Sequence, residues 1–107
     1  MKPKIIAIDL DGTTLNTESQ LSPRTREVLV RATKAGHFVT IATGRPFRMS
    51  DQFYKELALT TPMVNFNGGL VHKPRQVWAN EMEHSISREI AFELMAQKEQ
   101  LLSLIHI

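Results

Sequence analysis

The chain has 107 residues, a formal net charge of +2 and no cysteine, with 42% hydrophobic and 22% charged residues. This composition is ordinary for one small globular domain, and the lack of cysteine excludes a disulfide framework or a thiolate metal site. The scattered lysines and arginines argue against a nucleic-acid footprint, and no apolar stretch is long enough for a membrane span or a signal peptide. We therefore expect a cytoplasmic protein.

The first predicted element is a buried strand over residues 4–8, in which the four residues after Lys4 are apolar and three of them are isoleucine. Two carboxylates follow it, Asp9 and Asp11, and Gly12 then allows a sharp turn. Carboxylates are costly to desolvate unless a cation or hydrogen-bond donors meet them. Because open α/β sheets place ligands at the carboxyl ends of their strands, the pattern predicts that Asp9 and Asp11 hold Mg²⁺ near a phosphoryl group. The alternative is an acidic turn that only caps the next element.

Residues 9–13 read Asp-Leu-Asp-Gly-Thr. This stretch resembles the first motif of the haloacid dehalogenase superfamily of phosphatases, D-x-D-G-T. In that family the first Asp is the nucleophile that becomes a phospho-aspartate, and the second is the general acid and base. The resemblance implies these roles for Asp9 and Asp11, with Mg²⁺ as the cofactor.

A helix is predicted over residues 23–35. Ser22 can cap it, Pro23 suits its first position, and Gly36 suits its end. Its predicted apolar face consists of Val28, Leu29, Ala32 and Ala35. Residues 38–42 read as a second strand, which makes a βαβ unit with two parallel strands.

The βαβ unit brings a second group of residues to the sheet edge that carries Asp9. Thr43 offers a hydroxyl, Gly44 allows close approach to the backbone, and Arg45 offers a fork of donors for phosphate oxygens. The alternative is a plain strand-to-helix turn. In haloacid dehalogenase phosphatases a Ser or Thr ends this strand and binds the transferred phosphoryl group, and Thr43 matches it. Thr-Gly-Arg followed by Pro resembles the Cof-type branch, which implies that Arg45 lies near substrate phosphate.

A helix is predicted over residues 47–59, and a third strand over residues 63–66. The expected packing residues of that helix are Phe53 and Leu57, with Met49 and Tyr54. The pair Asn67-Gly68 follows the strand and is a strong hairpin signal. Cof-type proteins carry an Asn-Gly-small signature here, with the Asn at the rim of the active site. Both interpretations of Asn67, as a hairpin residue and as a substrate contact, stay open.

Farther on, residues 70–72 and 76–79 are predicted to pair as a hairpin, and a last helix is predicted from Ser85 or Ser87 to Lys98. Its apolar face consists of Ile90, Ala91, Leu94 and Met95. The histidines show no metal-ligand spacing and are expected at the surface or in turns; they are His37, His72, His84 and His106.

The resemblance covers residues 4 to about 100 but matches only the front part of the family, because the family's Lys and second acidic pair are not found. We expect an α/β fold: the N-terminal part of a Rossmannoid parallel sheet with flanking helices in residues 1–80, and the beginning of a cap domain in residues 81–107. Residues 101–107 resemble a translated sequencing adaptor, which suggests a truncated reading frame. The alternative is a genuine apolar terminus that docks as a strand or mediates association.

The resemblance implies Mg²⁺-dependent hydrolysis of phosphate monoesters, with sugar phosphates or similar small metabolites as the partners. Asp9 and Asp11 would carry the chemistry, and the phosphate would be held by Thr43, Gly44, Arg45 and Asn67. Two alternatives remain: an inactive fragment that only binds metal or phosphate, and a phosphomutase or phosphotransferase on the same core. The sequence leaves the individual substrate and the oligomeric state open.

Overall fold

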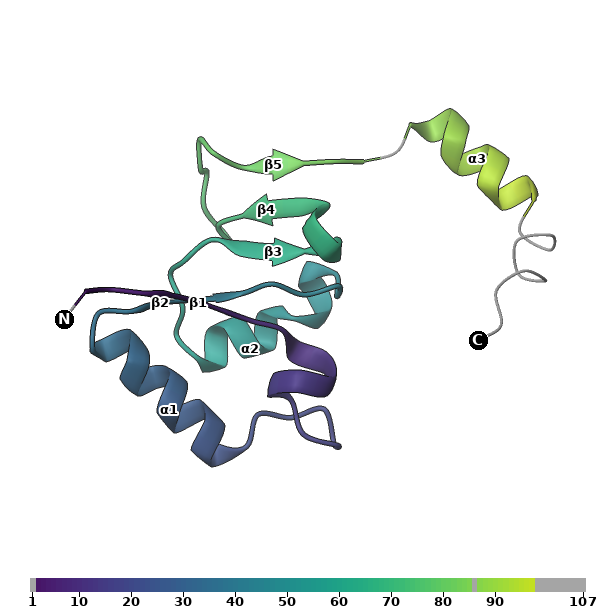
Figure 1. The fold of residues 1–107 in the computed structure, drawn as a ribbon. Coiled ribbons are helices and arrows are strands. Elements are labelled where there is room, and N and C mark those ends of the chain that lie inside the picture. Colours follow the sequence, from purple (N-terminus) through teal and green to yellow (C-terminus); the bar gives the residue numbers. More distant parts are fainter. Residues whose placement is uncertain (1, 86, 98–107) are drawn as a thin grey trace.

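The computed structural model of the chain describes residues 2–85 and 87–97. Strands β1 (Ile5–Ile8) and β2 (Phe38–Ile41) form a parallel pair, and β3 (Met63–Asn65), β4 (Leu70–His72) and β5 (Met82–Glu83) form an antiparallel sheet in that order. A parallel bridge between Ala42 and Val64 joins the two, so β1, β2 and β3 run in one direction (Figure 1). The predicted α/β class is confirmed, and the antiparallel strands β4 and β5 extend the sheet beyond β3.

The predicted βαβ unit is present. Helix α1 (Pro23–Lys34) begins where expected, because Ser22 Oγ accepts a hydrogen bond from the Thr25 amide at 3.2 Å. It ends just before Gly36, whose φ of 97° suits a glycine. The predicted apolar face is only partly correct, since Val28 is 54% exposed. The residues of α1 that pack against the core are Leu29, Val30 and Ala32.

The hydrophobic core lies between the strands and the two helices α1 and α2 (Asp51–Glu56), which Figure 1 shows on the same side of the strands. Its buried members are Leu10, Leu15, Leu21, Val39, Ile41, Phe53, Tyr54, Leu57, Leu59 and Met63. The core therefore covers one face of the parallel pair and anchors the carboxyl end of β1 through Leu10.

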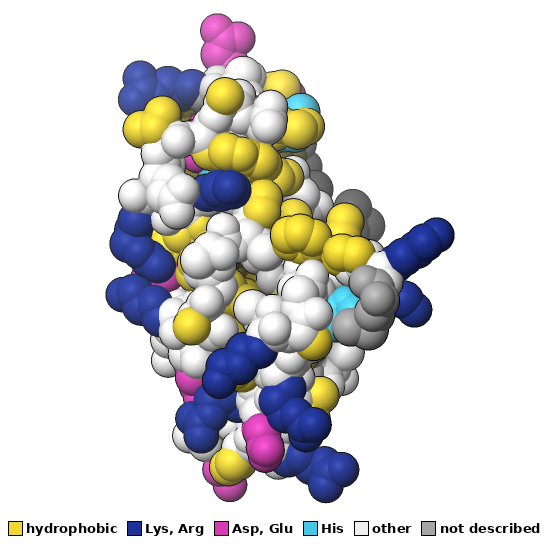
Figure 2. All heavy atoms as spheres, turned by 90° about the vertical axis from the view of Figure 1, so that its left-hand side faces the viewer, with side chains coloured by type: hydrophobic (Ala, Val, Ile, Leu, Met, Phe, Trp, Pro, Cys, Tyr) yellow, Lys and Arg dark blue, Asp and Glu magenta, His cyan; other side chains and the backbone are white. Residues whose placement is uncertain are grey.

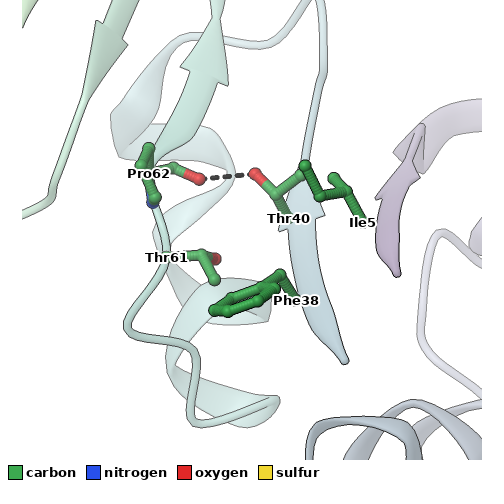
Figure 3. Close-up of a pocket in the computed structure, with 5 residues that line it drawn as sticks. All are labelled: Ile5, Phe38, Thr40, Thr61 and Pro62. Carbon is green, nitrogen blue, oxygen red and sulfur yellow. Dashed lines mark hydrogen bonds between the residues drawn. The ribbon is translucent and has the colours of Figure 1, made fainter. Parts of the chain in front are cut away.

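The prediction that the first strand is buried is wrong. Ile5 is 78% exposed, and in the described part of the chain β1 pairs with β2 alone. Parallel sheets usually have both faces covered, but among residues 2–85 and 87–97 the face opposite the core stays exposed. A cavity of about 390 Å³ lies on it, lined by Ile5, Phe38, Thr40, Thr61 and Pro62 (Figure 3). Figure 2, which views the side from which β1 starts, shows apolar side chains flanked by Lys and Arg.

The single helix predicted over residues 47–59 is divided. A 3₁₀ turn, Phe47–Met49, precedes α2, and Ser50 between them has a φ of −126° and a ψ of −14°. The Ser50 hydroxyl lies 3.0 Å from the Pro46 carbonyl oxygen and 3.2 Å from that of Phe47. A short polar side chain that bonds to nearby backbone competes with the helical pattern, which explains the break.

The predicted hairpin between residues 70–72 and 76–79 is also wrong. Strand β4 pairs instead with β5, where Leu70 faces Glu83 and Val71 faces Met82. Pro74 lacks a backbone N–H, and Arg75 takes a φ of 61°, so the chain leaves the sheet after β4. It returns to the sheet only at β5.

Helix α3 (Arg88–Ala96) starts from Ser87, one of the two predicted caps, whose Oγ accepts from the Ile90 amide at 3.2 Å. It lies apart from the strands in Figure 1, and Phe92 and Met95 are 60% and 67% exposed. The predicted helix end at Lys98 and the predictions for residues 101–107 lie outside the described residues. Of the helices in residues 2–85 and 87–97, none combines the length and apolarity needed to cross a membrane.

Candidate active site

The acidic motif forms a tight turn at the carboxyl end of β1. The Leu15 amide donates to the Leu10 carbonyl oxygen at 2.9 Å, and Gly12 has a φ of 73° inside the turn. Leu10 is fully buried and anchors the turn in the core, whereas Asp9 and Asp11 on either side are exposed. One buried leucine between two acids therefore directs both carboxylates to the solvent side of the sheet edge.

Asp9 is held by donors of its own turn. The Leu10 amide donates to Asp9 Oδ1 at 2.9 Å, and the Thr13 hydroxyl donates to Asp9 Oδ2 at 3.2 Å. These bonds restrict the rotation of the carboxylate and leave lone pairs on both oxygens free. A carboxylate fixed in this way can act as a nucleophile or as a metal ligand.

A cleft of about 330 Å³ opens at this sheet edge, between the ends of β1, β2 and β3. Its lining residues are Asp9, Ala42, Thr43, Gly44, Val64, Asn67 and Gly68. Four of the residues predicted for the site therefore share one cleft, because three parallel strands end side by side. The role of each toward a ligand stays a prediction.

Gly44 and Asn67 are in close contact across the cleft. A Cβ atom added to Gly44 would lie 2.8 Å from Asn67 Oδ1, closer than real Cβ contacts allow. The backbone N–H of Asn67 also donates to the Thr43 carbonyl oxygen at 3.1 Å. The hairpin interpretation of this segment is confirmed, since β3 and β4 pair antiparallel across it. The substrate contact by Asn67 remains a prediction.

The two remaining predicted residues, Asp11 and Arg45, pair with each other beside the cleft. Arg45 Nε donates to Asp11 Oδ2 and Arg45 Nη2 to Asp11 Oδ1, both at 2.7 Å. This bidentate hydrogen bonding and the positive charge of Arg45 hold the pKa of the Asp11 carboxyl below its ordinary range. Arg45 also donates from Nη1 to the Met49 carbonyl oxygen at 2.9 Å and lies over the Phe53 ring.

The donor set fits a divalent cation only in part. Mg²⁺ takes hard oxygen ligands and is often bound through one or two carboxylates together with water and substrate phosphate. Asp9 fits this requirement, because its carboxylate lines the cleft and has no cationic partner among the residues that the structure describes. Asp11 fits it only when released from Arg45, since both of its oxygens accept from the guanidinium. Within residues 2–85 and 87–97 there is no cluster of three or more His, Cys, Asp or Glu side chains placed to bind a metal.

Three polar residues behind the cleft were missed by the sequence reasoning. Asn65 and Ser50 are fully buried and His72 is 7% exposed, so the expectation of a surface position for His72 is wrong. They are joined by hydrogen bonds from His72 Nε2 to Asn65 Oδ1 and from Asn65 Nδ2 to Ser50 Oγ, both 2.8 Å. The available signal was the alternation of β3, which places Asn65 on the same face as the buried Met63.

Comparison with protein families finds one that accounts for this arrangement. The family model for haloacid dehalogenase-like hydrolases matches residues 6–106. Among solved structures, a haloacid dehalogenase-like hydrolase from Bacteroides thetaiotaomicron superposes with a TM-score of 0.74 at 25% identity, over 94% of this chain and 38% of that one. A haloacid dehalogenase-like hydrolase from Bacillus subtilis has a TM-score of 0.74 at 29% identity, over 90% and 33%.

Curated proteins that the chain resembles include phosphatases. The chain is 49% identical over 74 residues to the 5-amino-6-(5-phospho-D-ribitylamino)uracil phosphatase YitU of Bacillus subtilis, which covers 69% of this chain and 27% of the relative. It is 44% identical over 68 residues to the pyridoxal phosphate phosphatase YbhA of Escherichia coli, covering 64% and 25%. The chain thus spans about a quarter of the length of these relatives.

Proposed function

This chain belongs to the haloacid dehalogenase-like hydrolases, and we propose on that basis that its protein is a Mg²⁺-dependent phosphatase of small phosphorylated metabolites. The observation that carries the proposal is the cleft in which Asp9, Thr43 and Gly44 meet at the ends of parallel strands. The relatives named for ribitylaminouracil phosphate and pyridoxal phosphate support this substrate class, and sugar phosphates belong to the same class.

In the proposed reaction Asp9 attacks the phosphorus atom of the monoester. The bond from phosphorus to the alcohol oxygen breaks as a bond to a carboxylate oxygen of Asp9 forms, which gives a phospho-aspartate and the free alcohol. The Thr43 hydroxyl and the Gly44 N–H bind the non-bridging oxygens, because both residues line the cleft beside Asp9. Positioning and charge stabilisation of this kind account for most of the catalysis in phosphoryl transfer.

We assign Asp11 as the residue that moves protons. It gives a proton to the leaving alcohol and takes one from the water that hydrolyses the phospho-aspartate. A general acid must first hold its proton, and the pairing with Arg45 opposes this by favouring the ionised carboxyl. Substrate phosphate is a competing partner for the Arg45 fork, so its arrival would free Asp11 for this role.

Family membership implies a divalent metal in general, and Mg²⁺ is the ion that suits carboxylate and phosphate oxygens. Asp9 would hold it through its carboxylate, and Asp11 would contribute only in its ionised form and only when released from Arg45. When bound, the ion neutralises the negative charge of the phosphate and the carboxylate, which otherwise repel each other.

The proposal includes a division into two regions. Residues 1–80 form the N-terminal part of the core, and residues 81–107 begin a cap domain. The separation of α3 from the strands in Figure 1 supports this division, and β5 links the two regions by pairing with β4. A cap over the cleft would exclude water from the phosphoryl group and contact the rest of the substrate.

The test is hydrolysis of p-nitrophenyl phosphate by the full chain, with added Mg²⁺ and with a chelator. The proposal expects turnover that needs the metal and is lost in Asp9→Asn. Asp51→Asn is the matched control, because Asp51 is a carboxylate that pairs with Arg75 and Lys55 outside the cleft. Phosphate binding without turnover would favour the inactive-fragment alternative, and transfer of phosphate to an added sugar-phosphate acceptor would favour a phosphotransferase.

A further inference from the structure

A buried polar cluster lies directly behind the loop that carries Arg45. It consists of Asn65 at the end of β3, His72 at the end of β4 and Ser50 before α2. All three are buried, and in the described part of the chain every buried side-chain N or O atom has a hydrogen-bond partner. Buried polar groups are costly unless satisfied, so a satisfied cluster specifies one arrangement of the segments that it joins.

The Asn65 amide group is the centre of this cluster. Its Nδ2 donates to the Arg45 carbonyl oxygen at 2.9 Å and to Ser50 Oγ at 2.8 Å, and its Oδ1 accepts from His72 Nε2 at 2.8 Å. The orientation of the amide follows from chemistry, because a carbonyl oxygen can only accept and so must face the NH₂ end. His72 must then carry its proton on Nε2, since Oδ1 can only accept.

Through these bonds Asn65 determines where the Arg45 backbone lies. The Arg45 carbonyl oxygen also accepts from the Phe66 amide at 3.3 Å, and the Arg45 N–H donates to Thr43 Oγ1 at 3.0 Å. Both peptide groups of Arg45 are therefore anchored, which sets the direction of its Cα–Cβ bond. Phe66 takes a φ of 52°, a rare conformation for a bulky residue that persists only where the surroundings impose it.

The same amide also fixes the far end of the Arg45 side chain. Ser50 directly follows Met49, whose carbonyl oxygen accepts from Arg45 Nη1 at 2.9 Å. By bonding to Ser50, Asn65 ties this acceptor to the loop from which Arg45 starts. One side chain thus sets both the origin and the end point of the guanidinium that meets Asp11.

We propose that Asn65 is a positioning residue, held in orientation by His72 and Ser50, that aims Arg45 at Asp11 and at the phosphate site. The inference rests on the proposed function for its purpose, because Arg45 serves the chemistry only if phosphate enters the cleft. Its geometric content is separate and predicts how the Arg45 side chain behaves whether or not the chain turns over substrate.

The experiment measures hydrogen exchange at Arg45 Nε–H by NMR in the full chain. In the unaltered chain this proton is protected by its bond to Asp11 Oδ2, and Asp11→Asn gives the reference for weakened protection. We expect exchange about tenfold faster in Asn65→Leu and in His72→Leu, with the amide spectrum of β1 and β2 retained. His72→Gln keeps an N–H donor and should restore most of the protection.

Leu59→Ala is the matched control, because Leu59 is a buried core residue outside the polar cluster. It should lower the stability of the chain and leave Arg45 Nε–H protected. The proposal is overturned if Arg45 keeps its protection in folded Asn65→Leu and His72→Leu, or if His72→Gln loses as much as His72→Leu. If Asn65→Leu does not fold, the two His72 variants decide the matter. Absence of p-nitrophenyl phosphate hydrolysis would count against the proposed function and leave this result unaffected.

Discussion

Arg45 donates two hydrogen bonds of 2.7 Å to the Asp11 carboxylate, although the two residues are 34 positions apart in the sequence. The Arg45 side chain is 16% exposed and that of Asp11 is 57% exposed, so the pair is anchored from the arginine side. The carboxylate assigned to proton transfer is therefore held by a cation that phosphate can also bind. Control of Asp11 by Arg45 is a direct consequence of this geometry.

Replacing Arg45 by Gln should raise the pKa of Asp11 toward its ordinary value of about 3.9. The hydrogen bonds from Arg45 favour the charged carboxylate, so their loss makes protonation easier. Because the paired pKa is depressed, the stabilisation from this pair is present above the ordinary pKa and is lost as the pH falls through the lower, folded-state pKa. The measurement is an NMR titration of the Asp11 side-chain carboxyl carbon.

Arg75→Gln is the control for that titration, since it removes an ion pair with Asp51 outside the cleft. It should leave the Asp11 curve unchanged. An Asp11 pKa that does not move in Arg45→Gln would show that the ion pair is absent in solution.

Gly44→Ala should close part of the cleft without unfolding the chain. The added Cβ would meet Asn67 Oδ1 at 2.8 Å and push this side chain into the cleft. We expect binding of inorganic phosphate, followed by NMR titration of the Thr43 and residue-44 amides, to weaken about tenfold. Gly36→Ala is the matched control: it strains a φ of 97° and costs about 1 kcal/mol of stability, but leaves the cleft open. If Gly44→Ala binds phosphate as tightly as the unaltered chain, the assignment of Gly44 to the phosphate site is contradicted.

His72 should make the stability of the fold depend on pH. Burial disfavours the charged imidazole and lowers the pKa of His72 in the folded chain, with a smaller opposing effect from Glu81. The unfolded chain then binds a proton more readily, so stability falls as the pH drops from about 6.5 to the lower pKa of the folded state. Denaturant unfolding at a series of pH values measures this slope, and it should be reduced in His72→Gln. A slope of the same size in that variant would assign the effect to another group.

The open face of the parallel pair should promote self-association. Ile5 and Phe38 are 78% and 55% exposed, and they line the apolar cavity in Figure 3 beside a strand edge that lacks a partner in the described residues. Unpaired apolar strands of this kind tend to associate with other chains. Phe38→Glu should therefore reduce light scattering at high protein concentration, with little loss of stability because the side chain is half exposed.

Val28→Glu is the comparison for that experiment, because Val28 is also about half exposed, at 54%, but belongs to helix α1 and not to a strand. It should change scattering much less than Phe38→Glu. A chain that lacks residues 101–107 tests the alternative source of association, and a loss of scattering only on removal of that segment would contradict the role of the sheet face.

Local signals were sufficient for much of the fold. The cap at Ser22, the proline after it and the glycine at position 36 correctly bounded α1, since capping depends on residues within one helical turn. The single helix predicted over residues 47–59 from its apolar spacing is interrupted at Ser50, because the Ser50 hydroxyl bonds to the backbone there. The predicted hairpin partner of β4, residues 76–79, was wrong, because pairing between strands depends on which segment of the chain reaches the edge of the sheet.

The sequence alone determined the family, through the acidic motif over residues 9–13 and the residues that follow the second strand. It also determined which residues gather at one sheet edge, because the order of strands and helices brings Asp9, Thr43 and Asn67 to the same end of the parallel strands. Only the tertiary structure decided that Asp11 is bound by Arg45 and that His72 is buried. It also decided that the Asn65 side chain bonds to both the Arg45 backbone and Ser50. Motifs record which chemical groups are present. Which groups become partners depends on burial and on distances between segments far apart in the chain, and these exist only once the core has formed.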